Sequence, residues 1–269
     1  MSASLLDLQT MTSQQFNLSR FSLLLKLYWA EHGKSYLISL GLIVGIMASL
    51  MAAIVGTSQY NDLLFILHAV AMFGGVMLGG SLFTSTAFAA YASADKGIAA
   101  IMLPASQIEK FVSILLPTLL FAVVVFAVGY GLHYGLVDLA NDGLLSTSKK
   151  YQPAPPFVMH FFAFSYLLLQ GAVFLGSLYF TKNAFIKTLG IVLLITSLAF
   201  VFNILLAYQF TGQPRSVMTF PFLPWDVFLD QRYQVQYPTL VSNLIKVFLA
   251  LVTVAFGCIT YVRLKEKEI

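Results

Sequence analysis

The sequence contains one cysteine, Cys258, and few charged residues, which together make up 10% of the chain. A single cysteine cannot form a disulfide within its own chain, and it excludes a metal site built from several cysteines. Soluble domains carry about 25% charged residues, so this low content excludes an ordinary soluble protein. The net charge of +4 comes from basic residues scattered among the polar segments. Nucleic-acid-binding surfaces cluster their basic residues instead, so no nucleic-acid partner is indicated.

Motifs for catalysis are also missing. The sequence has no helical His-Glu-x-x-His pattern and no Gly-x-Ser-x-Gly turn, so neither zinc-dependent proteolysis nor serine hydrolysis is indicated. Gly33-Lys34-Ser35 resembles the end of a nucleotide-binding P-loop, but Tyr28 stands where that loop requires its first glycine. The sequence therefore predicts that the chain is not an enzyme and holds no cofactor or metal of its own.

What the sequence has instead is a series of six long apolar runs, and apolar residues make up 59% of the chain. A bilayer core of ~30 Å needs about 20 apolar residues in a helix, and each run reaches this length. Because hydrocarbon cannot satisfy open backbone groups, each run must be helical. The sequence therefore predicts an all-α polytopic membrane protein with six transmembrane helices, at 35–56, 63–91, 112–137, 157–181, 185–209 and 240–262.

The lysines and arginines predict the orientation of the chain. With the N-terminus in the cytoplasm, ten of them lie in cytoplasmic segments, four lie in external segments, and Lys246 lies within the last run. Basic residues are enriched in cytoplasmic loops, so both termini are expected in the cytoplasm and the protein in the cell inner membrane. The first 34 residues lack the apolar core and cleavage site of a signal peptide. We expect a cytoplasmic tail and amphipathic helix at 1–34 and the membrane domain at 35–269.

The segment before the first run predicts an amphipathic helix that is too polar to span the bilayer. Its apolar side chains recur at helical spacing, at Phe21, Leu24, Leu25, Tyr28 and Trp29. Aromatic rings favour the level of the lipid headgroups, so this helix is expected to lie at the membrane interface. It is either a simple anchor that leads into the first span or a lateral helix against which a partner packs.

The cytoplasmic segment 92–111 contains the most specific local pattern. Ser106 and Glu109 have the spacing of a capping box, which predicts that the third span begins just after Ser106, and Pro104 favours a turn before it. The segment also carries four apolar side chains: Ile98, Ile101, Met102 and Leu103. Apolar side chains in a cytoplasmic loop indicate either a docking surface or burial beneath the helices.

The external segments differ in composition. Segment 138–156 is polar and ends in several prolines. Segment 210–239 mixes prolines with apolar residues in a stretch that is too short to cross the bilayer. We expect the second segment to dip into the outer leaflet or to lie on it.

Few polar side chains lie inside the predicted spans. An ionisable group near the bilayer centre costs ~3 kcal/mol or more, which makes it a functional candidate. His68 lies in the second run, Gln170 in the fourth and Asn203 in the fifth. Each is either part of a translocation path or a hydrogen-bonding group between helices. No aspartate or glutamate lies at the centre of a run, which argues against a proton-coupled carrier.

Two loops resemble a known family. The stretch Met102-Leu-Pro-Ala-Ser-Gln-Ile-Glu-Lys-Phe111 is similar to a motif of ABC transporter permeases of the type-2 class, as they occur in Bacteroidota. The stretch Tyr179-Phe-Thr-Lys-Asn-Ala-Phe-Ile-Lys-Thr188 resembles the loop between spans four and five of the same family. The amphipathic segment resembles the family's elbow helix, and the segment between the last two spans resembles its re-entrant outer helices.

This resemblance implies the permease subunit of an ABC exporter, which pairs with a second permease subunit, in a homo- or heterodimer, and with separate ATPase subunits that bind ATP and Mg²⁺. The substrate would be amphiphilic, namely a lipid, a peptide or a drug. The implied ATPase contacts are Asp95, Lys96, Ile98, Leu103, Pro104, Glu109, Lys182 and Asn183. A second interpretation is a non-transporting membrane scaffold or sensor that binds a cytoplasmic partner. A stable complex with an ATPase subunit would distinguish the two.

Overall fold

A computed structural model of the chain describes residues 16–92, 97, 102–212, 217–218, 225–228, 231–235 and 238–267. Within this part, six helices are each long and apolar enough to cross a membrane, as expected of a membrane-spanning protein. They are α2 (Leu18–Met51), α3 (Asp62–Thr84), α6 (Gln107–Gly143), α7 (Pro156–Tyr179), α8 (Ala184–Thr211) and α9 (Thr239–Lys267). The predicted set of six long apolar helices is confirmed.

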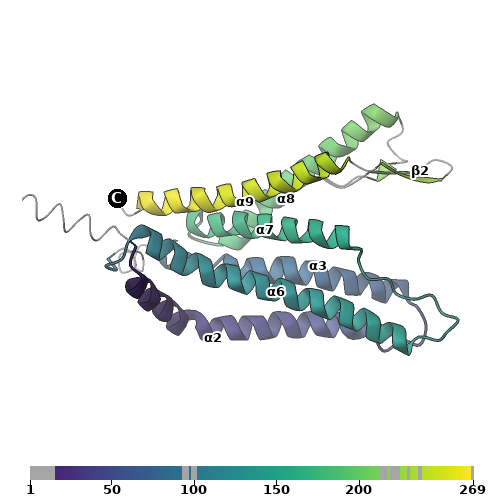
Figure 1. Cartoon of the computed structure of the whole chain (residues 1–269), viewed down its shortest axis with the longest axis horizontal. Coiled ribbons are helices and arrows are strands. Elements are labelled where there is room, and N and C mark those ends of the chain that lie inside the picture. The colour runs from purple at the N-terminus through teal and green to yellow at the C-terminus, as the bar shows by residue number, and fades with distance from the viewer. Residues whose placement is uncertain are drawn as a thin grey trace, which may run out of the picture.

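The predicted amphipathic segment is helical, but it is continuous with the first span. The side chain of Asn17 caps α2 by accepting hydrogen bonds from the backbone N–H groups of Ser19 and Arg20. The helix then continues to Met51 and tightens into the short 3-10 helix η1 (Ala52–Ile54). Figure 1 shows the first turns of α2 inclined to the rest of the helix. The segment thus leads directly into the first span as one bent helix, while the resemblance implies an elbow helix.

The second span ends earlier than the sequence predicts. α3 stops at Thr84 rather than near residue 91, and a run of turns leads to the single helical turn α4 (Ala89–Ala92). Ser85 and Thr86 donate side-chain hydrogen bonds to the backbone carbonyls of Leu82 and Phe83. Serine and threonine hydroxyls compete in this way with the helical hydrogen bonds of the backbone, which gives the helix a natural end at this point.

The third span begins where the capping box predicts. Ser106 caps the first turn of α6, and the reciprocal bonds between Ser106 and Glu109 are both present. The helix runs on to Gly143, six residues beyond the predicted end of the span. Pro117 lies inside the helix, where it removes the hydrogen bond that its N–H would have donated one turn back.

Four of the long helices enclose the main core. α2 packs on α3 and α6, and α3 packs on α6 and α7. Large side chains from these helices interlock, including Met47, Met72, Phe121 and Tyr166, all of which are nearly inaccessible to solvent. Figure 1 shows these helices side by side along the long axis of the molecule.

The last two long helices lie on the outside of this group. α9 packs along α7, and α8 packs on α7 as well. In Figure 1 the far ends of α8 and α9 diverge from the other helices. The most apolar 18-residue stretch of α8 contains no buried residue, so in a membrane this stretch faces lipid or another protein.

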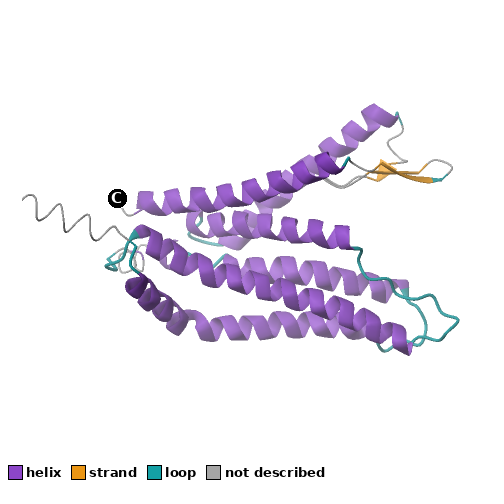
Figure 2. Cartoon of the chain, viewed as in Figure 1, coloured by secondary structure: helices purple, strands orange, loops and turns teal. Residues whose placement is uncertain are grey.

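Where the structure describes the segment between α8 and α9, it forms a small antiparallel sheet, and the re-entrant helices implied by the resemblance are not found among these described residues. Its strands are β1 (Val217–Met218), β2 (Trp225–Phe228) and β3 (Arg232–Val235), in the order β1-β2-β3. Val227 in β2 pairs with Val217 on one side and with Tyr233 on the other. Figure 2 shows the strands at the end of the molecule opposite the C-terminus. β-branched and aromatic residues are enriched in β2 and β3, as is typical of strands.

Candidate docking end of the helix bundle

One end of the molecule gathers the segments that the sequence predicts to be cytoplasmic. The start of α2, the start of α6, the turn between α7 and α8 and the end of α9 all lie there (Figure 1). The two ends of the described chain therefore lie on the same side, as six crossings require. We name this region the docking end and define it by residues 16–32, 85–92, 102–110, 178–188 and 260–267.

Glu109 ties two helix starts together at the docking end. Its carboxylate accepts hydrogen bonds from the backbone N–H of Ser106 at 2.8 Å and from the backbone N–H of Asn17 at 2.5 Å. The guanidinium of Arg20 lies 3.2 Å from the same carboxylate. Glu109 is fully buried, so its side chain braces α2 against α6 from the inside. The structure thus gives Glu109 an internal role, and its predicted contact with an ATPase subunit stays a prediction.

A cluster of buried apolar side chains lies at the docking end. Phe88 follows α3, Phe174 and Leu178 lie on α7, and Leu264 lies on α9; all four are buried and pack in one cluster with Ile114 of α6. The rings of Phe88 and Phe174 are 4.8 Å apart. Because cores are close-packed and resist compression, a displacement of the segment around Phe88 would be passed to three other helices.

The loop before α6 presents part of the predicted contact surface. Met102 is 77% exposed and Pro104 is exposed as well, whereas Leu103 is half-buried. Ile108, on the first turn of α6, is 47% exposed. Asp95, Lys96 and Ile98 lie outside the described residues. Exposed apolar side chains beside a polar helix start are typical of a surface that another protein covers.

The turn between α7 and α8 presents the second predicted surface. Lys182 and Asn183 are both exposed. Asn183 adopts the left-handed conformation, with φ 55° and ψ 39°, which asparagine tolerates better than most residues. This conformation reverses the chain within four residues and places the turn at the tip of two long helices.

The end of α9 is bound to the same region. The Lys267 ammonium donates hydrogen bonds to the backbone carbonyls of Leu178 at 2.9 Å and of Tyr91 at 3.4 Å. Arg263 pairs with Glu266, and its guanidinium lies 4.8 Å from the ring centre of Tyr179. A cation near the carbonyl end of a helix is electrostatically favourable, so the last turn of α9 holds the end of α7 in place.

His68 lies far from the docking end, in a buried pair with His133. His68 Nδ1 is 3.0 Å from the carbonyl of Met51, and His68 Nε2 is 2.9 Å from His133 Nδ1. The backbone N–H of Ala154 donates to His133 Nε2 at 3.0 Å. Since that nitrogen is an acceptor, His133 Nδ1 carries its proton and donates to His68, which in turn donates to Met51. With both rings neutral, all four ring nitrogens have a hydrogen-bonding partner. Both rings are almost fully buried.

Gln170 occupies a polar contact between α3 and α7. Its amide oxygen accepts a hydrogen bond from the Thr84 hydroxyl, and its amide nitrogen donates to Ser81 Oγ at 3.3 Å. Tyr166, one turn earlier, donates to a backbone carbonyl of α6 at 3.1 Å. Gly80 permits this close approach, because a Cβ there would lie 2.0 Å from the Tyr166 hydroxyl oxygen. Gln170 thus serves as a hydrogen-bonding group between helices.

Asn203 connects α8 to the small sheet. Its side-chain oxygen accepts a hydrogen bond from the indole N–H of Trp225 at 3.0 Å. Asn203 is half-buried, and Trp225 begins β2. His68, Gln170 and Asn203 are therefore not brought together in one place, and each has a hydrogen-bonding partner from another element.

Several contacts of the docking end are not predicted from the sequence. The bonds from Asn17, Arg20 and Lys267 join positions far apart in the chain, and no local pattern identifies such partners. Within the part of the chain that the structure describes, no group of three or more histidine, cysteine or carboxylate residues could hold a metal ion. Comparison with protein-family models, with curated proteins and with solved structures found no match.

Proposed function

We propose that this chain is the permease subunit of an ABC exporter of the inner membrane, with both termini in the cytoplasm. Separate ATPase subunits would bind at the docking end and hydrolyse ATP with Mg²⁺, because the chain has no P-loop of its own. The cargo would be amphiphilic, since the spans contain few charged groups. In the sequence, the proposal rests on the resemblance of segments 102–111 and 179–188 to two loops of this family.

The observation that supports it most is the way the two exposed loops join one cluster of buried apolar side chains. The surface formed by Met102 and Pro104 leads into the first turn of α6, and the turn at Lys182 leads into α7 and α8. Both are backed by the cluster around Phe88 and Phe174. A closing motion of bound ATPases would push this cluster and shift α6, α7 and α9 together, which is a common way to transmit a switch.

The proposed ATPase contacts change in two respects. Met102 joins Leu103, Pro104, Lys182 and Asn183 on the proposed surface, because its side chain is 77% exposed. Glu109 is no longer among the proposed contacts, because it is fully buried. We propose that it holds α2 and α6 together instead. Asp95, Lys96 and Ile98 stay in the proposal as predictions from the sequence.

A second permease subunit is supported by the exposure of α8. Its most apolar stretch contributes nothing to the core of this chain. A stretch of helix that buries no residue against its own chain is available to pack against another subunit in the membrane. Since His68, Gln170 and Asn203 are each bonded to a neighbouring element, we place the translocation path at this intersubunit face rather than along those three side chains.

The proposal is tested by purifying the tagged chain from its native membranes in a mild detergent and identifying the proteins that accompany it. We expect a P-loop ATPase subunit in stoichiometric amount. The variant Met102→Asp should lose the ATPase but keep its own yield and elution volume. Leu145→Asp is the matched control, because Leu145 is 53% exposed in the loop at the opposite end of the molecule. A stable partner other than an ATPase would favour the scaffold or sensor function and overturn the proposal.

A further inference from the structure

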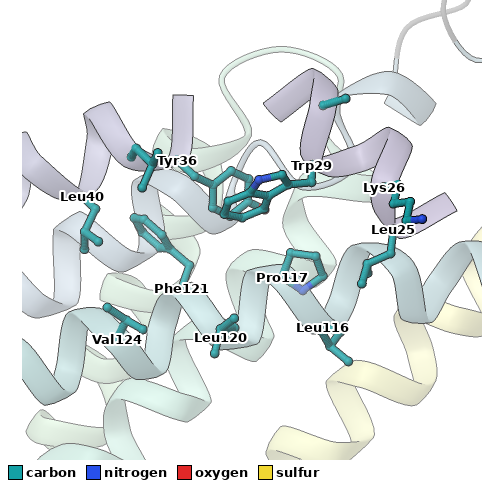
Figure 3. Close-up of a pocket in the computed structure, with 12 residues that line it drawn as sticks. Leu25, Lys26, Trp29, Tyr36, Leu40, Leu116, Pro117, Leu120, Phe121 and Val124 are labelled. Atoms are coloured by element: carbon teal, nitrogen blue, oxygen red, sulfur yellow. The ribbon is translucent and has the colours of Figure 1, made fainter. Parts of the chain in front are cut away.

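An apolar groove of about 470 Å³ runs between α2 and α6, near the docking end. Figure 3 shows α2 contributing Trp29, Tyr36 and Leu40, and α6 contributing a row of side chains from Leu116 to Val124. The complete lining is Leu25, Lys26, Trp29, Ala30, Tyr36, Leu37, Leu40, Leu116, Pro117, Leu120, Phe121 and Val124. None of the contacts assigned to ATPase docking uses this groove.

The walls of the groove are fixed by close packing. The indole of Trp29 lies against α2 itself, and a Cβ on Gly33 would come within 3.0 Å of that ring. Tyr36 is buried between α2 and α6, with its ring 5.5 Å from that of Phe121, and its hydroxyl is bonded to Tyr28 at 2.8 Å. The buried rings of Tyr36 and Phe121 therefore hold one wall of the groove in place.

The chemistry of the groove changes along its length. Aliphatic and aromatic side chains line most of it, and several remain open to the surroundings: Leu37 is 62% exposed and Leu120 is 58% exposed. Lys26, at one end, is the single charged residue in the lining. Its ammonium is exposed and makes no ion pair with any residue that the structure describes. The groove thus combines an apolar trough with one unneutralised cation at its mouth.

The dimensions match one lipid tail. The volume of about 470 Å³ is many times that of one water molecule, ~30 Å³, so it accommodates an acyl chain. From Leu116 to Val124 the helix rises ~12 Å, close to the ~15 Å depth of hydrocarbon in one leaflet. Tryptophan and lysine at the same end are typical of the headgroup level of a membrane.

We propose that this groove binds one acyl chain of an anionic phospholipid, with the lipid phosphate at the Lys26 ammonium. A groove that opens sideways into hydrocarbon is filled by acyl chains and not by water. The cation then selects lipids with net negative charge, because a phosphate of a zwitterionic lipid carries its own compensating ammonium. The lipid would stay bound between α2 and α6 and would not be transported. This proposal therefore does not depend on whether an ATPase binds the chain.

The site is tested in nanodiscs of phosphatidylcholine with phosphatidylglycerol, a small part of which carries a photoreactive diazirine on one acyl chain. After irradiation and proteolysis, mass spectrometry locates the labelled peptides. We expect labels concentrated on 25–40 and 116–124, well above those on the exposed face of α8. Labels spread evenly over all exposed apolar faces, or replaced by crosslinks to a polypeptide, would overturn the proposal.

Two pairs of variants separate the tail site from the headgroup site. Leu120→Trp fills the groove and should lower its labelling at least fivefold, while Leu198→Trp, at a 61% exposed position on α8, should leave it unchanged. Lys26→Gln should lower the preference for the anionic over the zwitterionic lipid about fivefold, as expected for one basic residue at a charged membrane surface. Lys34→Gln, on the same helix but outside the groove, is the matched control. An unchanged preference in Lys26→Gln would refute the headgroup assignment even if Leu120→Trp failed to fold.

Discussion

Replacing Glu109 by glutamine should loosen the docking end from within. The substitution keeps the shape of the side chain but turns one of its oxygens into an NH₂ donor that faces a backbone N–H or Arg20. The carboxylate accepts hydrogen bonds from Ser106, Asn17 and Arg20. At least one of these three bonds is lost in the variant, and the others no longer involve a charged acceptor. A hydrogen bond to a charged group contributes about 1.5–3 kcal/mol, so we expect Glu109→Gln to lower the free energy of unfolding by about 3 kcal/mol.

The assay is unfolding of the purified protein in mixed micelles of increasing SDS content, followed by loss of helical circular dichroism. Glu266→Gln is the control, because it removes a carboxylate that pairs with Arg263 on the exposed surface of α9, where ion pairs contribute little. A loss of about 3 kcal/mol corresponds to a roughly 100-fold change in the ratio of folded to unfolded protein. If the two variants unfolded at the same SDS content, the bracing role of Glu109 would be refuted.

Three further predictions concern the interior and the topology of the bundle. His68→Leu leaves the proton of His133 without an acceptor and should cost about 2–3 kcal/mol in the same unfolding assay, whereas His160→Leu, at an exposed position, should change little. Gly80→Ala should cost about 1–3 kcal/mol through overpacking of α3 against α7, while Gly74→Ala, whose Cβ would meet nothing within 4 Å, should be neutral or slightly stabilising. Protease sites appended to the two termini should be cut from the same face of sealed vesicles; cutting from opposite faces would rule out an even number of crossings.

The long helices could be predicted from the sequence because the bilayer imposes a length and a composition that no other setting requires. Their ends were less predictable, since side chains decide them. The capping box at Ser106 is a local pattern and was enough to place the start of α6. The hydroxyls of Ser85 and Thr86 end α3 by a competing local bond, and the apolar run continues past them, so hydropathy alone extends the span too far.

The partners of the polar residues could not be predicted, because they depend on contacts between distant elements. His68 and His133 are 65 positions apart, and nothing in either run indicates that the two rings meet. The same holds for Glu109 and Asn17, whose bond makes a side chain expected on the surface an internal one. The sheet between α8 and α9 does have a local signal in the β-branched and aromatic residues of β2 and β3, but prolines and apolar residues around it favour an interfacial interpretation.

The most direct test of the account is ATP hydrolysis by the complex purified with this chain and reconstituted in lipid nanodiscs. Coupling predicts that the accompanying ATPase turns over ATP at a rate that depends on the membrane subunit and falls when the subunit carries Met102→Asp, with Leu145→Asp equal to wild type. If the chain came without an ATPase, or if ATP turnover were the same with and without it, the proposed coupling would be contradicted.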